Sequence, residues 1–301
     1  MHIWSFMVKS LLWSKIIRQI RRYNLSLPLK YFRMKKSQIS NVLRQIGLIY
    51  LTDWIRYYLE RYKNRKMNKA FKKKNPQVKL PPDYLIYESF QINYQKYYTE
   101  SIDTAKWVAD HFRKHTELKD KKILDWGCGP GRIIRHLPSV VGNGCEYFGT
   151  DYNAKSIDWC SENLPGISFN KNPLNASLPY SGDFFDLIYG ISIFTHLSEQ
   201  LHYDWYDELY RILRPGGIMF LTTQGDNFKV KLTDSELIRY NKGELIIRGN
   251  VKEGHRTYSA FHPTDFMEKL FCSSEILEHI KTPPAKVEGW LPQDIWMIKK
   301  R

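Results

Sequence analysis

A chain of 301 residues suits one large domain or two modest ones, and a hydrophobic content of 43% is ample for a packed core. The charge is uneven, because residues 1–80 hold 20 lysines and arginines against two acids and so carry +18, whereas the remainder carries −3 of the total of +15. The four cysteines are scattered without a CxxC pair, which argues against a zinc site or a disulfide framework and favours a reducing, intracellular compartment.

Two apolar patterns lie in the basic quarter of the chain. We predict that this quarter is a helical extension over residues 1–79, followed by a second domain over residues 80–301. The first pattern, over residues 3–20, falls on one side of a helix but contains too many charges to span a bilayer, and no signal-peptide cleavage site follows it. The second pattern runs from Ser40 to Tyr62, where we expect the helix to end in a lysine-rich run.

This extension, basic and rich in Trp and Tyr, has more than one interpretation. Aromatic rings favour the headgroup zone and cations favour anionic lipid, which predicts a cytoplasmic protein that is peripheral on the inner face of the membrane. The alternative is that its apolar faces pack on the second domain. Nucleic-acid phosphates are a less favoured partner, because only a bilayer also rewards burying the aromatic rings. If the extension is a membrane anchor, removing residues 1–70 leaves the ligand binding of the second domain intact.

The second domain opens with a helix. Leu80-Pro81-Pro82 stops any preceding helix, and the segment from Tyr84 to Tyr98 is unusually aromatic. Residues 101–114 then carry apolar side chains at helical spacing, which predicts the helix before the first strand.

The central motif of the chain is an apolar run, residues 122–126, that breaks into a glycine-rich turn at Gly127, Gly129 and Gly131. This is typical of a buried strand, a tight loop and a helix. Glycines bend the backbone through positive φ and let it lie against a ligand, while the helix start offers N–H groups to an anion. A dinucleotide fingerprint would need a glycine where Arg132 stands, so the pattern disfavours a nicotinamide cofactor.

Further strands follow at regular distances. Residues 146–151 form an apolar run ending in Asp151, twenty places after Gly131, and residues 167–170 are a weaker strand before Asn172-Pro173-Leu174. Residues 185–190 and 213–221 read as the fourth and fifth strands, and residues 274–281 and 294–300 as a closing antiparallel pair. Asp151 is also open to a simpler interpretation as a helix N-cap.

These ordered motifs resemble those of the Rossmann-like (class I) S-adenosylmethionine-dependent methyltransferases. The resemblance covers residues from about 80 to the C-terminus, and it implies an α/β, three-layer fold with a seven-stranded sheet. It implies S-adenosylmethionine as the cofactor, with Asp151 on the ribose hydroxyls and Asn172 at the adenine. The upstream segment would close over the cofactor, with Tyr97, Tyr98 and Ser101 as candidates. The implied cofactor-binding residues are Asp125, Gly127, Cys128, Gly129, Gly131, Asp151, Tyr152, Asn172, Leu174 and Gly190.

Two segments of the sequence bear on which group accepts the methyl. Residues 190–193 lack the Asn/Asp-Pro-Pro-aromatic motif of enzymes that methylate base nitrogens, and no cysteine stands beside a proline as cytosine-carbon methylation requires. We expect residues 224–262, a long polar excursion, to build the acceptor pocket. The catalytic candidates are His196, His262 and Tyr258. The alternatives are that His196 caps backbone groups and that His262 only precedes a helix start.

The sequence therefore predicts methyl transfer from S-adenosylmethionine to an acceptor hydroxyl, without a metal. The segment of residues 191–217 resembles a bacterial subgroup associated with glycan and metabolite pathways, which favours a sugar, glycan or small metabolite. The alternative is an RNA or DNA methyltransferase whose +18 arm binds phosphates. A protein that binds the cofactor without catalysis is a third class.

Overall fold

The computed structural model describes residue 44 and residues 47–142, 144–283 and 291–301, all within one compact unit that spans Lys36–Arg301. The predicted helix over residues 3–20 lies outside them. The predicted domain boundary near residue 80 stays a prediction. None of the described helices is both long and apolar enough to cross a membrane.

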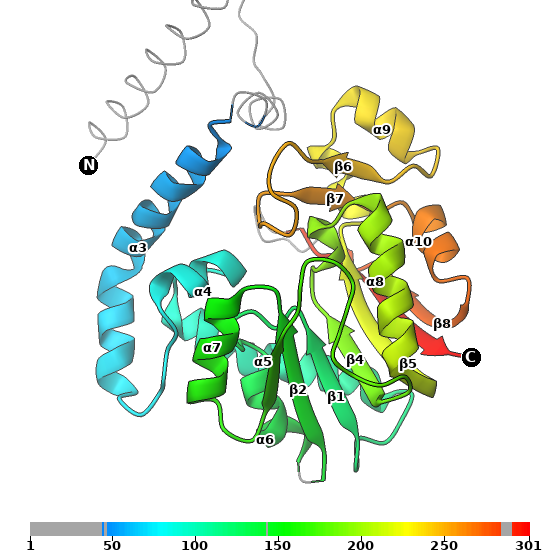
Figure 1. The fold of residues 1–301 in the computed structure, drawn as a ribbon. Helices are drawn as coiled ribbons and strands as arrows, with labels where there is room; N and C mark the ends of the chain where they lie inside the picture. The colour runs from blue at the N-terminus through cyan, green and yellow to red at the C-terminus, as the bar shows by residue number, and fades with distance from the viewer. Residues whose placement is uncertain (1–43, 45–46, 143, 284–290) are drawn as a thin grey trace, which may run out of the picture. The chain divides into compact units, whose positions relative to one another are not determined.

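Seven strands form one mixed sheet in the order β3-β2-β1-β4-β5-β9-β8 (Figure 1). The first five run parallel to one another, whereas β9 runs antiparallel to both β5 and β8. This confirms the predicted α/β, Rossmann-like fold, including its closing antiparallel pair. The strands are β1 (Lys122–Trp126), β2 (Glu146–Asp151), β3 (Ser168–Lys171), β4 (Phe185–Gly190), β5 (Leu213–Thr223), β8 (Ser274–Ile280) and β9 (Asp294–Lys300).

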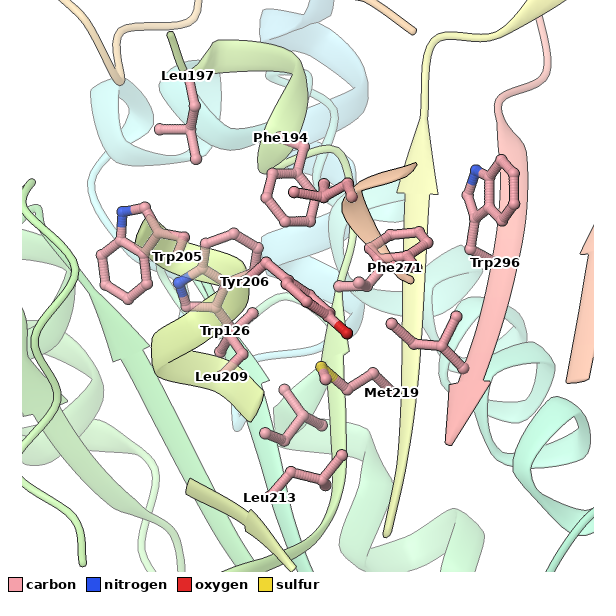
Figure 2. Packing of buried hydrophobic residues seen from close by; sticks show 14 of the residues in the cluster. Trp126, Phe194, Leu197, Trp205, Tyr206, Leu209, Leu213, Met219, Phe271 and Trp296 are labelled. Carbon is pink, nitrogen blue, oxygen red and sulfur yellow. The ribbon is translucent and has the colours of Figure 1, made fainter. Parts of the chain in front are cut away.

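Helices cover both faces of the sheet because side chains alternate along each strand. Ile123 and Phe220 share a core with one set of helices, α5 (Glu100–Arg113), α6 (Leu137–Val141) and α7 (Ala154–Asn163). Their neighbours Leu124 and Met219 share the opposite core with α8 (Glu199–Ile212) and α10 (Thr264–Leu270). Figure 2 shows the aromatic side chains of this second core.

The N-terminal described helix, α3 (Ile49–Lys74), continues through the lysine-rich run, so the predicted end at Tyr62 was wrong. Its inner face carries Asn68 and Phe71, both buried, toward α4 (Asp83–Ser89) and η1 (Gln95–Thr99). Phe71 shares a small core with Ile86, Tyr94 and Tyr97. This part of the extension therefore packs on the domain that follows it.

Residues 224–262 are structured rather than a polar excursion. They contain η4 (Asp226–Lys231), α9 (Asp234–Tyr240) and a two-stranded sheet of β6 (Ile246–Arg248) and β7 (Ser259–Phe261). Figure 1 shows α9, β6 and β7 together beyond one end of the large sheet. A core of its own holds this insertion together: Phe228, Leu232, Tyr240, Ile246 and Phe261.

Candidate functional site

The glycine-rich loop lies across the carboxyl ends of β1 and β2. Gly127, Gly129 and Gly131 all adopt positive φ, at 77°, 52° and 74°. The N–H groups of Gly127 and Cys128 both donate to the carbonyl oxygen of Thr150, which ties the loop to β2. A β-carbon on Gly127 would lie 2.1 Å from Cδ1 of Ile193, so only glycine fits between the loop and the segment after β4.

Asp151 ends β2 and faces this loop. Its Oδ2 accepts from the N–H of Gly129 at 2.8 Å and its Oδ1 accepts from the N–H of Asn153 at 2.7 Å. The N-cap of α7 is Asn153, so the helix-cap interpretation of Asp151 was wrong. Burial raises the pKa of Asp151 to about 6, and the two N–H groups partly oppose that rise. Each oxygen keeps lone pairs for a further donor, as a ribose hydroxyl requires.

Asp125 and Arg132 lie on the other side of the loop. Burial raises the pKa of Asp125 to about 7. The guanidinium of Arg132 donates to Oγ of Ser101 at 3.1 Å and lies 4.3 Å from the ring centroid of Phe90. A carboxylate and a guanidinium beside one cavity suit the ammonium and carboxylate groups of a methionine end. In the sequence, Arg132 stood out only as a departure from the dinucleotide fingerprint, so this place in the site was not predicted.

Three cavities meet at Gly127, which lines all of them. The largest has a volume of about 800 Å³, and Asp125 and Arg132 are in its wall. A second cavity of about 200 Å³ lies beside Asp151, and a third of about 60 Å³ lies between Asp151 and Asn172. Their arrangement follows the order expected for a cofactor: the methionine end, the ribose, and then the adenine.

The smallest cavity contains an unsatisfied acceptor. Oδ1 of Asn172 is buried and has no hydrogen-bond partner among the described residues, while its Nδ2 donates to the carbonyl of Pro173 at 2.7 Å. Tyr152 and Leu174 supply apolar contact in the same cavity. A buried amide oxygen without a donor costs free energy, and an adenine amino group would satisfy it. The residues therefore fit S-adenosylmethionine at both of its ends.

Two of the predicted cofactor residues, Gly131 and Gly190, lie against neighbouring side chains. A β-carbon on Gly131 would lie 2.5 Å from Cδ1 of Leu164, and one on Gly190 would lie 2.7 Å from the ring of Trp126. Neither glycine lines the three cavities, whereas Cys128 lines the largest. Glycine at these two positions lets neighbouring elements approach the loop closely.

The predicted lid residues do not line the large cavity. The hydroxyl of Tyr97 donates to the carbonyl of Pro130 at 2.7 Å, which supports the loop from behind, and Tyr98 packs on His136. Neighbouring residues form the wall in their place. From the segment that ends α4 and from α5 these are Ser89, Phe90, Gln91, Glu100, Thr104 and Trp107.

His196 is the predicted catalytic residue that lines a cavity, since it borders both the second and the third. Its Nδ1 lies 2.9 Å from the carbonyl oxygen of Tyr258. Because a carbonyl only accepts, Nδ1 carries the proton and Nε2 is unprotonated. Burial lowers the pKa of His196, so the ring is neutral at pH 7. Nε2 has no hydrogen-bond partner within the described part of the chain.

Tyr258 and His262 do not line the three cavities. Tyr258 is buried, and its backbone carbonyl, rather than its hydroxyl, contacts His196. Burial also raises the pKa of the Tyr258 hydroxyl to about 12. His262 is buried with its Nε2 at 3.0 Å from Nε2 of His202. Tyr258 therefore holds the ring of His196, whereas His262 contacts His202.

A further group braces the ribose side of the site. The guanidinium of Arg256, which lines the second cavity, lies 3.9 Å from the ring centroid of Tyr87 and 3.7 Å from Oδ1 of Asp53. The hydroxyl of Tyr87 donates to the same Oδ1 at 2.8 Å. One turn earlier in α3, the hydroxyl of Tyr50 accepts from the N–H of Lys252 at 2.7 Å. Thus α3 holds the loop of residues 252–257 against the cofactor site.

Within the described residues, no three His, Cys, Asp or Glu side chains come together in a way that could hold a metal ion.

Asp151→Ala should weaken S-adenosylmethionine binding by about 1–3 kcal/mol, because a hydroxyl and two buried N–H groups lose a charged acceptor. Wild-type affinity should fall as the pH drops through about 6, where Asp151 gains a proton, and through about 7 for Asp125. The variant should keep only the second dependence. Calorimetry across pH measures both, with Asp158→Ala on the exposed face of α7 as the control. Unchanged affinity in Asp151→Ala would contradict the ribose assignment.

Comparison with known proteins agrees with this geometry. Residues 123–217 match the family model of a methyltransferase domain. The chain is 28% identical over 154 residues to phthiotriol/phenolphthiotriol dimycocerosates methyltransferase 1 of Mycobacterium ulcerans, covering 47% of this chain and 54% of that one. It is 29% identical over 131 residues to malonyl-acyl-carrier protein O-methyltransferase of Enterobacter lignolyticus, covering 38% and 50%.

A third relative is named as a tRNA methyltransferase. The chain is 26% identical over 151 residues to tRNA (carboxymethyluridine(34)-5-O)-methyltransferase of Arabidopsis thaliana, covering 50% of this chain and 34% of that one. The chain thus spans about half the length, or less, of these curated relatives. The resemblance to S-adenosylmethionine-dependent methyltransferases is confirmed, and with it the cofactor.

Proposed function

We propose that this chain, whose residues 123–217 form a class I S-adenosylmethionine-dependent methyltransferase domain, methylates an acceptor hydroxyl of a sugar, glycan or small metabolite. One observation supports this choice of acceptor. Ser192, Thr222 and Gln293 line the large cavity and hydrogen-bond one another, with Gln293 donating to Ser192 at 2.7 Å and Thr222 donating to Gln293 at 2.6 Å. Uncharged donors and acceptors of this kind suit a hydroxylated ligand.

When bound, S-adenosylmethionine supplies a methyl group that its sulfonium already activates. The chain's own residues then have three tasks: Asp125, Arg132 and Asp151 hold the cofactor, the Ser192 network orients the acceptor, and the insertion excludes water. His196 accepts the hydroxyl proton at Nε2. A positioned base of this kind contributes about 10²–10⁴-fold.

We assign supporting roles to the other two catalytic candidates, Tyr258 and His262. The Tyr258 carbonyl fixes the tautomer of His196, and His262 packs against His202. For the partner and location, we propose a cytoplasmic protein that is peripheral on the inner face of the membrane through residues 1–79. The basic composition of this extension supports that location.

The acceptor class is tested by incubating the protein with tritiated S-adenosylmethionine and cell fractions. We expect label in a carbohydrate or lipid-glycan fraction. Gln293→Leu should raise the KM for that fraction by about tenfold through the loss of hydrogen bonds, with cofactor affinity unchanged. Gln200→Leu, on the exposed side of α8, is the matched control.

Label that appears only in RNA or DNA would refute the sugar, glycan or small-metabolite acceptor proposed here and promote the nucleic-acid alternative. The basic extension is the feature that supports that alternative. Its binding to RNA should then weaken steeply as the salt concentration rises.

A further inference from the structure

The outer face of α3 is an exposed surface that the domain does not cover. Trp54, Tyr58, Leu59 and Tyr62 are 56%, 46%, 54% and 63% exposed, and they line a shallow apolar groove along the helix. The inner face of the same helix is used by Asp53, Asn68 and Phe71, as described above. A soluble monomer seldom leaves so many large apolar side chains together in water.

The net charge of α3 indicates which kind of surface its outer face would bind. The helix contains nine lysines and arginines against two acids, a net charge of +7. Both acids are already paired within the protein, Asp53 with Tyr87 and Glu60 with Lys63. Arg65, which borders the groove, lies 4.4 Å from the ring centroid of Tyr62. Arg61, which also borders the groove, is paired with Asp83 at 2.9 Å, whereas Arg65 has no carboxylate partner among the described residues. Aromatic side chains beside such a cation, on a helix of this net charge, suit the headgroup zone of an anionic bilayer.

The same helix also reaches the catalytic cavity. Arg56, one turn after Asp53, lines the cavity of about 800 Å³ that contains the glycine loop. Its side chain is exposed and has no hydrogen bond or ion pair with another described residue. One helix thus presents an unpaired guanidinium to the cavity and an aromatic, basic face to the outside.

We propose that the outer face of α3 docks on an anionic membrane surface and that the acceptor is an amphiphile drawn from that surface, with an anionic group that pairs with Arg56. This inference rests on the proposed methyl transfer to a hydroxyl. It adds the substrate class: a hydroxylated head carrying a phosphate or carboxylate, attached to an apolar anchor that stays in the bilayer. Arg56 holds the anionic group while the Ser192 network holds the hydroxylated part.

Docking is tested with the full chain and vesicles of phosphatidylglycerol and phosphatidylcholine in equal parts. The variant Trp54→Ser/Leu59→Ser/Tyr62→Ser should lose about tenfold or more in vesicle partitioning, because each buried apolar side chain favours the interface. Val230→Ser/Ile238→Ser, at positions that are 78% and 60% exposed on the insertion, should not. Partitioning of the triple variant equal to that of wild type overturns docking through α3. So does a wild-type chain that ignores vesicles while the triple variant changes its oligomeric state or stability, because the face is then covered by protein.

The substrate class is tested with vesicles of total lipid extract and tritiated S-adenosylmethionine. Arg56→Gln should bind vesicles as wild type does but transfer label into acidic lipid about tenfold more slowly, as expected for one charge-assisted contact. Lys66→Gln, on the same helix but outside the cavity, should transfer label normally. Label confined to water-soluble acceptors, or a normal rate in Arg56→Gln, overturns the amphiphile. Calorimetry with S-adenosylmethionine separates these results from a failure of the proposed function, which would show as no label in any fraction despite cofactor binding.

Discussion

Deleting residues 1–74 should abolish S-adenosylmethionine binding, whereas deleting residues 1–43 should leave it within about twofold. The first deletion removes α3, and with it the contacts of Tyr50 and Asp53 to the loop of residues 252–257. That loop supplies Gly254 and Arg256 to the cavity beside Asp151. Composition alone suggested that residues 1–70 are dispensable for cofactor binding, and the packing of α3 reverses that expectation.

The size of this effect follows from burial. Phe71 is 6% exposed in a cluster with Ile86 and Tyr94, and losing such a side chain from a core costs about 3–5 kcal/mol. Asn68 also donates to the carbonyl of Ile92 and accepts from the N–H of Tyr94. The segment of residues 83–94 would lose both its apolar cover and these hydrogen bonds. It also contains Ser89 and Phe90 of the large cavity wall.

A point variant separates loop bracing from general instability. Asp53→Ala keeps α3 but removes the acceptor for Tyr87 and the partner of Arg256, and it should weaken cofactor binding about tenfold. Asp207→Ala, at an exposed position of α8, is the control. Circular dichroism checks that both variants are folded. A folded protein of residues 75–301 with wild-type affinity would show that α3 is not part of the site.

The glycine loop and the sheet could be predicted because their signals are local. Gly127, Gly129 and Gly131 occupy positive φ, and Asp151 stands at the end of the next strand, both of which follow from spacing in one stretch of chain. The contacts that complete the site are not local. Arg256 meets Tyr87 and Asp53 across more than 160 residues, and no periodicity in the sequence encodes that pairing.

Two predictions, the end of α3 and the irregular structure of the insertion, were wrong although the sequence contains local signals for the correct structure. Lysine is a good helix former and is favourable in the last turn of a helix, so the run that ends at Lys74 extends α3 rather than breaking it. In the insertion, Thr233 and Glu236 form a capping box, which marks the start of α9. The roles of Tyr258 and His262 had no such signal. They depend on the Tyr258 carbonyl, rather than its hydroxyl, contacting His196 and on the His262 ring contacting His202.

Replacing His196 should slow methyl transfer by about 100-fold or more, the effect of removing a positioned general base. His196→Ala and His196→Asn should share this loss. The amide of asparagine can still donate to the Tyr258 carbonyl, as Nδ1 of the histidine does at 2.9 Å, but it cannot accept a proton at neutral pH. The comparison therefore separates the base at Nε2 from the hydrogen bond at Nδ1.

The pH profile provides a second, independent readout. Because burial lowers the pKa of His196 from its ordinary value, the neutral ring persists to a lower pH than that of a free imidazole, and protonation should reduce kcat only on the acidic side of that value. Rates are measured with tritiated S-adenosylmethionine, and cofactor affinity is measured separately by calorimetry. If His196→Asn transfers methyl at the wild-type rate while His196→Ala does not, the residue only anchors Tyr258. If both variants instead lose cofactor affinity in proportion to rate, His196 belongs to the ribose site that it shares with Asp151.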